Sequence, residues 1–323
     1  MTASEGAATD RRADAQVRAS GPGGSIYDLG YQGYEGPRLG REAAIRALFW
    51  HTVRSCYGIG RGGRAKIAPF TLAALAVLPA VVAVGISAVA LQVAGQSGEV
   101  VDVLEGNSPI RYATYHGLVS TLVMLFCAAQ APELLGRDQR FGVLPVYFSR
   151  ALARLDYAVA KMLGLVVSLW GMVLVPYAVL FIGRVLVAPD PIEGLSNELP
   201  SLAPLLAQSL LTSGLLGAIA MAISAFTPRR AYATVGIIAA FLIPSIVVAL
   251  VTGTLSGSVE DWIVILSPVD VLDGSNAALF EVRPDSQAVV AANLDAIAFY
   301  GAALAGIAAA LGVTIRRYLR IAA

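Results

Sequence analysis

Long runs of apolar residues, separated by polar connections, dominate the pattern of this chain. The runs cover about 67–94, 112–131, 158–188, 201–226, 231–252 and 292–315. Each run is long enough to cross a hydrocarbon core of roughly 30 Å as a helix, and none has a charged residue near its centre. Backbone groups in lipid must hydrogen-bond within their own segment, which helices achieve. The pattern therefore predicts an all-α integral membrane fold with six transmembrane helices, over a domain of residues 67–323.

The chain before the first run is polar. Residues 1–25 contain few apolar side chains and are predicted to be a disordered tail. The next segment, 26–41, interleaves glycines with three tyrosines, Tyr27, Tyr31 and Tyr34. Such a segment is too short to form a core. It is either a linker or an extended arm that contacts a partner or the membrane surface.

Residues 38–57 have helical periodicity. Ile45, Leu48, Phe49, Val53 and Cys56 fall on one side of the predicted helix. Charged residues and Trp50 recur on another side, which is typical of a helix at the membrane interface. A core helix of a small soluble domain is the alternative, but no apolar partner precedes it. We therefore expect 26–66 to comprise the tyrosine-rich arm and an amphipathic interfacial helix.

Basic residues indicate the orientation of the chain. All arginines and lysines except Arg111, Arg184 and Arg283 lie before the first run, after the last run, or in the second-to-third and fourth-to-fifth connections. The opposite connections are rich in Asp and Glu. Because cytoplasmic connections carry the excess of Lys and Arg, both termini are predicted to be cytoplasmic. The expected location is a bacterial cytoplasmic membrane, crossed several times.

The polar insert that ends the second run and leads into the third is predicted to be cytoplasmic too. Its sequence is PELLGRDQRFGVLPVYFSRALARLDYAVAK, residues 132–161. The pattern predicts two short helices broken at Gly142 and Pro145, with Pro132 in the first turn of the first, where its missing N–H costs nothing. Such an insert is either a solvated loop that only fixes topology or a docking element for a soluble partner.

The connection between the fifth and sixth runs, about 253–291, is the longest on the outer side. Its segment DWIVILSPVDVLDGSNAALF, residues 261–280, is apolar but interrupted by Pro268, Asp270, Asp273 and Gly274. This segment is too short and too broken to cross the membrane. It predicts a re-entrant or interfacial pair of short helices.

Composition agrees with a membrane protein and offers little catalytic chemistry. Apolar residues make up 57% of the chain and charged residues 14%, with mean hydropathy +0.70 and a net charge of +1. His51 and His116 are isolated and read as hydrogen-bonded structural residues, and Cys56 and Cys127 as inert thiols. A stripe of small residues, from Ser209 to Ser224, predicts close helix packing. We expect no metal site, no cofactor and no nucleic-acid partner.

This arrangement resembles the ABC-2 type transporter permeases. The resemblance covers about residues 38–323, and the connection between the second and third spans carries most of it. There the family pattern has an acidic residue, a basic residue, a glycine, a Ser-Arg pair and a lysine that opens the third span. The places are filled by Glu133, Arg137, Gly142, Ser149, Arg150 and Lys161.

The resemblance implies a permease homodimer that associates with two copies of a separate ATP-binding subunit, which would bind ATP and magnesium. The permease has no ATPase motif and would not itself be an enzyme. Its loop 132–157 would be the coupling helix, and its substrate a drug, lipid or natural product. The implied interface consists of Glu133, Arg137, Asp138, Arg140, Gly142, Ser149 and Arg150. A membrane anchor or sensor that recruits a cytosolic partner, and an integral membrane enzyme, are the alternatives.

Overall fold

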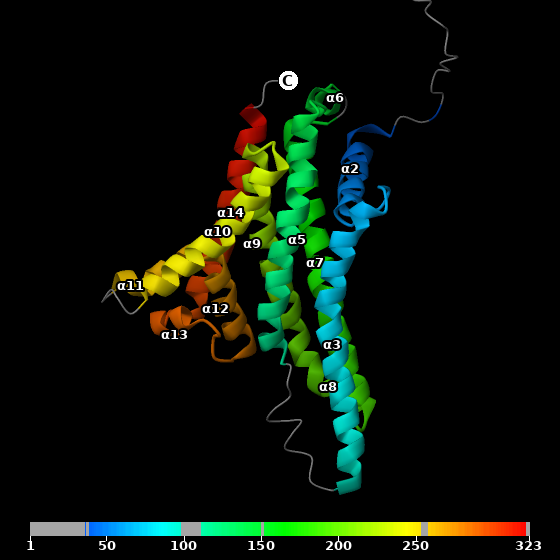
Figure 1. The fold of residues 1–323 in the computed structure, drawn as a ribbon, viewed down its shortest axis with the longest axis vertical. Helices are drawn as coiled ribbons and strands as arrows, with labels where there is room; N and C mark the ends of the chain where they lie inside the picture. Colours follow the sequence, from blue (N-terminus) through cyan, green and yellow to red (C-terminus); the bar gives the residue numbers. More distant parts are fainter. Residues whose placement is uncertain (1–35, 37–38, 98–110, 150–151, 253–257, 321–323) are drawn as a thin grey trace, which may run out of the picture. The chain divides into compact units, whose positions relative to one another are not determined.

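The computed structural model describes residues 36, 39–97, 111–149, 152–252 and 258–320 (Figure 1). The chain divides into two units, Met1–Arg38 and Leu39–Ala323, and almost all described residues belong to the second. Every element within these ranges is a helix. The expected tail at 1–25 and the three tyrosines of the arm lie outside the described residues.

Helices, both long and short, form most of the second unit. In chain order they are α2 (Gly40–Cys56), α3 (Arg64–Ser97), α5 (Tyr112–Arg140), α6 (Leu144–Phe148), α7 (Arg154–Val187), α8 (Pro191–Glu198), α9 (Leu202–Phe226), α10 (Arg230–Val251), α11 (Ser258–Ile263), α12 (Pro268–Phe280), α13 (Gln287–Ala292) and α14 (Ala296–Arg320). Within the described part of the chain, six segments are long and apolar enough to span a membrane. They match the six predicted runs, with α8 and α9 together forming the fourth.

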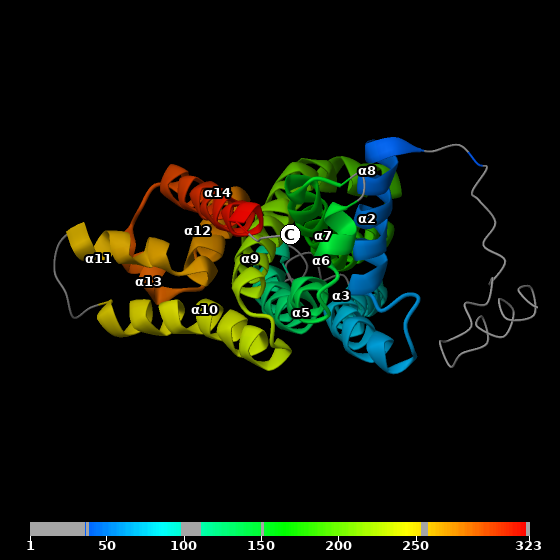
Figure 2. The ribbon, with the colours of Figure 1, turned by 90° about the horizontal axis from the view of Figure 1, so that it is seen from above.

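Helices α5, α7 and α9 pack against one another and form the centre of the bundle (Figures 1 and 2). The small-residue stripe of α9 lies in this centre: Ser209, Ser213, Ala220 and Ser224 are fully buried. A Cβ atom added at Gly217 would lie 3.0 Å from Leu169 of α7. The stripe therefore serves packing within the chain, as the sequence predicted.

The predicted helix at 38–57 is confirmed as α2, and it packs along α7. Leu48 and Cys56 are buried, as expected from their side of the helix, but Thr52 and Ser55 are buried with them. The covered face is thus more polar than the sequence pattern suggested. Gly164 of α7 allows the close approach, since a Cβ atom there would lie 2.7 Å from the Thr52 Cβ.

The connection between α10 and α14 contains short helices, as predicted for 261–280. Helix α12 begins after Ser267, whose hydroxyl accepts a hydrogen bond from the Asp270 N–H, and ends at Glu281 in a left-handed conformation. A second, smaller core joins this region to the end of α10 and the start of α14; it contains Val248, Val264, Ala288, Val289, Ala292 and Phe299. These contacts hold the short helices against the bundle.

The insert at 132–161 differs from its prediction in one respect. Helix α5 runs without interruption through Pro132 to Arg140, so Pro132 does not start a new helix. Proline removes the hydrogen bond to the carbonyl four residues earlier, which is Ala128. The Thr234 hydroxyl of α10 donates to that carbonyl at 2.9 Å and replaces the missing bond. Because the carbonyl is satisfied, the helix continues.

The break at Gly142 is confirmed, whereas the expected break at Pro145 is wrong. Gly142 has a φ of 63°, in the left-handed region that glycine adopts without strain. Pro145 lies in the first turn of α6, where its missing N–H has no helical partner to lose. The chain therefore turns at Gly142 and starts the five-residue helix α6 at Leu144.

Candidate functional site

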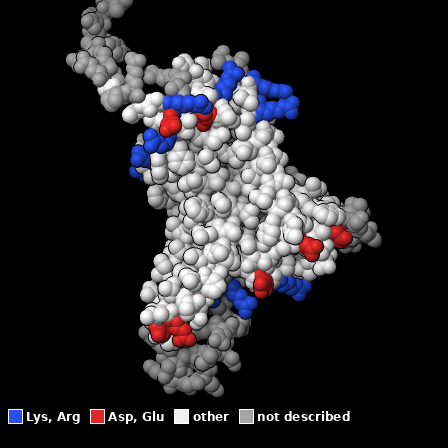
Figure 3. Space-filling view, turned by 180° about the vertical axis from the view of Figure 1, so that it is seen from behind, with Lys and Arg blue, Asp and Glu red and all other residues white. Residues whose placement is uncertain are grey.

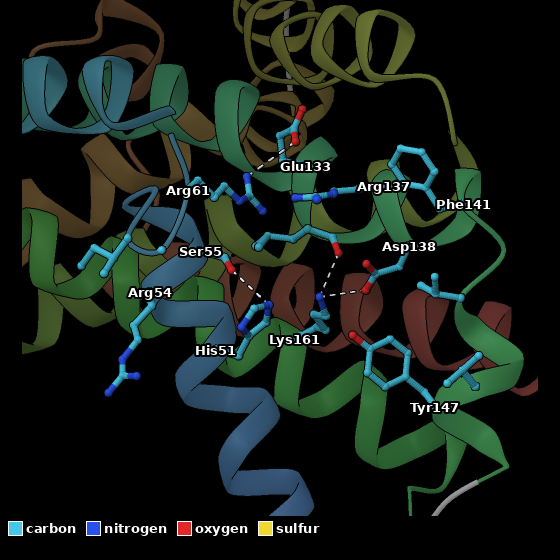
Figure 4. A pocket seen from close by; sticks show the side chains of 15 residues that line it. His51, Arg54, Ser55, Arg61, Glu133, Arg137, Asp138, Phe141, Tyr147 and Lys161 are labelled. Carbon is cyan, nitrogen blue, oxygen red and sulfur yellow. Dashed lines mark hydrogen bonds and ion pairs between the residues drawn. The ribbon is translucent and has the colours of Figure 1, made fainter. Parts of the chain in front are cut away.

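Charged side chains concentrate at the α6 end of the bundle. Figure 3 shows lysine and arginine side chains gathered at this end and a broad band without charge below them. A groove of about 940 Å³ opens here between α2, the following turn, the last turns of α5, and α6. Figure 4 shows the side chains that line it. This groove is the candidate functional site, because it contains three of the residues predicted to form the interface, Glu133, Arg137 and Asp138.

Asp138 forms a buried ion pair in the floor of the groove. The Lys161 ammonium of α7 lies 2.9 Å from Asp138 Oδ2 and donates to the Leu134 carbonyl at 3.1 Å. The Tyr157 hydroxyl also donates to Asp138 Oδ2, at 2.8 Å. A buried charge needs such partners to offset its lost hydration. Asp138 therefore fastens α5 to α7.

Glu133 joins three parts of the chain. Its carboxylate lies 2.9 Å from Arg230 at the start of α10 and 3.6 Å from Arg61 in the turn after α2. The side chain remains about a quarter exposed, at 24%. Glu133 thus has ion-pair partners within the chain, although the sequence reasoning assigned it to contact with another protein.

Arg137 and Arg140 are exposed on the last turns of α5. No carboxylate of the described chain lies within ion-pair distance of either guanidinium. Arg140 lies over the Phe141 ring at 4.9 Å, and only Arg137 lines the groove. Gly142 forms the turn between α5 and α6. Ser149 follows α6, and its hydroxyl donates a hydrogen bond to the Val146 carbonyl. Arg150 lies outside the described residues.

An aromatic cluster connects α6 to the bundle. The Tyr157 ring of α7 lies 5.5 Å from Tyr147 and 5.9 Å from Phe148, both in α6, and 5.3 Å from Tyr318 of α14. Gln139 donates to the Tyr318 hydroxyl at 3.0 Å and to the Ala225 carbonyl of α9 at 3.1 Å. Sequence reasoning missed Tyr157, Tyr318 and Gln139. The only available signal was the four-residue spacing of Tyr157 and Lys161, which places both on one helix face.

Two titratable groups near the groove have shifted pKa values. Burial lowers the pKa of His51 below its usual value, and the charge of Lys161 lowers it further, so the imidazole favours its neutral form. Its Nε2 lies 3.4 Å from the Ser55 hydroxyl. Burial raises the pKa of the Tyr147 hydroxyl, which stays protonated.

Histidine and cysteine side chains of the described residues do not gather into a metal site. These residues contain no group of three His, Cys, Asp or Glu side chains that could hold a metal ion. His116 is buried and contacts the Tyr177 hydroxyl at 3.2 Å and Gln208 at 3.1 Å, as expected for a structural histidine. Cys56 and Cys127 are buried free thiols, and burial raises the pKa of Cys56 to about 11.

Comparison with known proteins adds no assignment: no protein-family model and no curated protein matches the chain. The spans, the groove and the contacts of α6 are therefore the features that bear on function.

Proposed function

We propose that this chain is the membrane-spanning permease subunit of an ABC-2 type exporter, powered by a separate ATP-binding subunit. One observation carries the proposal. Helix α6 is a short element at the charged end of six apolar helices, and it rests on an aromatic cluster that reaches α7 and α14. Its surroundings expose apolar and basic side chains, with Phe141 61% and Val146 60% exposed. Exposed apolar groups beside exposed arginines favour a protein partner.

The contacts of α6 provide a route for mechanical coupling. A partner that displaces α6 would push on Tyr157, which is also bonded to Asp138 at the end of α5. Packed side chains with fixed contacts transmit such displacements because protein interiors are dense and poorly compressible. Movement of α6 would therefore reach α5, α7 and α14 together. In this proposal ATP hydrolysis in the partner would drive that movement.

The remaining features of the proposal follow from the same scheme. Two permease copies would pair, since α3, α10 and α14 leave wide apolar faces uncovered. Two partner subunits would bind ATP and magnesium. Both termini would be cytoplasmic, by the charge bias, and α11 and α12 would form a re-entrant or interfacial segment outside. A drug, lipid or natural product suits export through an apolar dimer.

Charge reversal at Arg140 tests the docking of the partner. Arg140 is exposed, belongs to the implied interface and does not line the groove. Arg140→Glu should reduce co-purification of the proposed ATP-binding subunit, because a repulsive contact at an interface costs several kcal/mol. Arg46→Glu is the matched control, since Arg46 is an exposed arginine of α2 and the charge change is identical. The control should retain the partner.

Two outcomes would contradict the proposal. Equal partner binding by Arg140→Glu and wild type would remove α6 and its flanking turn from the interface. A stable complex whose ATP hydrolysis responds to no transport substrate would favour the anchor or sensor role over transport.

A further inference from the structure

The groove at the α6 end carries unbalanced positive charge. Asp138 is neutralised by Lys161, and the closer partner of Glu133 is Arg230 at 2.9 Å, whereas Arg61 lies 3.6 Å away. Arg137 has no carboxylate partner among the described residues. Figure 4 shows the Arg61 and Arg137 side chains extending toward one another across the groove. Two converging guanidinium groups repel unless an anion lies between them.

Part of the groove wall is apolar. Ile59 is 50% exposed, and Phe141 and Val146 also line the opening with large exposed fractions. Apolar walls beside two arginines suit an amphiphile better than a free inorganic ion, since a free ion gains nothing from apolar contact. The ligand should therefore combine an anionic head with hydrocarbon.

The groove lies where such an amphiphile would be supplied. It includes Arg61, three residues before the span that begins at Arg64, and the last turns of α5, which ends at Arg140. Trp50 of α2, next to the lining residue His51, is 56% exposed. Tryptophan and arginine at the end of a span are typical of headgroup depth. The groove thus faces the region that phospholipid headgroups occupy.

We propose that this groove binds the phosphate of an anionic phospholipid headgroup between Arg61 and Arg137, with the lipid's apolar part against Ile59 and Phe141. Guanidinium groups bind phosphate through paired, charge-assisted hydrogen bonds. The bound phosphate, with its one negative charge, reduces the repulsion between the two guanidinium groups and bridges the turn after α2 to the end of α5. The inference needs only a membrane location and does not depend on whether an ATP-binding subunit docks.

Lipid binding by the purified full-length chain tests the inference without any partner subunit. Native mass spectrometry would count phosphatidylglycerol and phosphatidylcholine molecules retained by the protein from mixed micelles. The wild type should retain phosphatidylglycerol in preference. Arg61→Gln and Arg137→Gln should each weaken that retention about fivefold, the effect of removing one basic residue at an anionic membrane surface. Arg46→Gln should retain lipid as the wild type does, and Arg137→Lys should keep most of it.

Each alternative result has a distinct meaning. Equal retention of phosphatidylglycerol by Arg137→Gln and Arg46→Gln would overturn the site. Displacement of the lipid by millimolar inorganic phosphate would assign the groove to a free anion and overturn the lipid assignment. If Arg137→Gln retained lipid normally but no longer co-purified with the ATP-binding subunit, the groove would be a protein interface instead. Arg137 has no ion pair with any described residue, so its variant remains informative even where Arg61→Gln unfolds.

Discussion

Helices α5, α7 and α9 differ from α3, α10 and α14 in how far the chain itself covers them. In the most apolar stretch of each span, 61%, 44% and 67% of positions are buried in the spans of α5, α7 and α9, against 17%, 17% and 11% in those of α3, α10 and α14. The central helices also hold most of the buried polar side chains, among them His116, Gln130, Gln208 and Thr212. The two sets therefore have different surroundings.

The comparison shows which part of the fold depends on lipid or on a second copy. A soluble protein places its most apolar helices inside, yet here α3 and α10 are more apolar than α5 and largely uncovered. Uncovered apolar helices are stable in hydrocarbon, where helix contacts depend on small residues and hydrogen bonds. The central helices have both. Substitutions in the two sets should accordingly have different costs, which the following predictions test.

The largest difference is expected for ion pairs. Lys161→Met leaves the Asp138 carboxylate buried with only the Tyr157 hydroxyl as donor, and should destabilise the protein by about 3–5 kcal/mol. Arg41→Met breaks the ion pair between Arg41 and Asp156. The Arg41 side chain is 62% exposed, so this change should alter stability little. Thermal unfolding in detergent measures both. Adding Asp138→Asn to Lys161→Met should recover much of the loss. Equal losses for Lys161→Met and Arg41→Met would show that burial does not decide the cost of breaking an ion pair.

A smaller difference is expected for glycines. Gly164→Ala places a Cβ atom 2.7 Å from Thr52 Cβ and 3.3 Å from the Phe49 carbonyl, so α2 must shift on α7. Overpacking of this kind costs about 1–3 kcal/mol. Gly312→Ala in α14 meets open space and should stabilise its helix by up to about 1 kcal/mol. The midpoints of thermal unfolding should thus move in opposite directions, and a shared direction would refute the assignment of α14 to the open set.

The sequence predicted the spans well because span length and lack of charge are local properties. It predicted the turn at Gly142 for the same reason, since the conformation there suits glycine. Continuation of α5 through Pro132 was not predictable in this way. It depends on the Thr234 hydroxyl of α10, a helix that begins about a hundred residues after Pro132. Only tertiary packing brings this hydroxyl to Ala128.

The candidate site was predicted as a set of residues but not as an arrangement. Sequence reasoning treated Glu133 and Asp138 as free for a partner, because their own partners lie elsewhere in the chain. Arg230 and Lys161 reach them only once α10 and α7 are packed on α5. Arg137 and Arg140 are exposed, and neither has a carboxylate partner among the described residues. Ion pairs between distant segments therefore account for most of the difference.

The smallest expected effect concerns His51, on a helix that packs on the central set but remains partly open to solvent. Burial and the charges of Lys161, Arg61 and Arg137 lower its pKa in the folded chain, and only Asp138 opposes them. The unfolded chain takes up a proton at the usual pKa of about 6.5. Protonation therefore favours the unfolded state as pH falls below that value, and the folded state loses stability in that range.

The pH dependence of unfolding isolates this contribution. We expect the stability of the wild type relative to His51→Gln to be constant above about pH 7.5 and to decline as the pH is lowered through 6.5 toward the depressed pKa of the folded state. Arg46→Gln controls for a substitution in α2 that removes no group titrating in this range. The change should be small, because the imidazole is exposed enough for water to screen the neighbouring charges. A relative stability that rises on acidification would mean that Asp138 dominates the surroundings of His51, and that the groove is less positive than the pairing of its charges indicates.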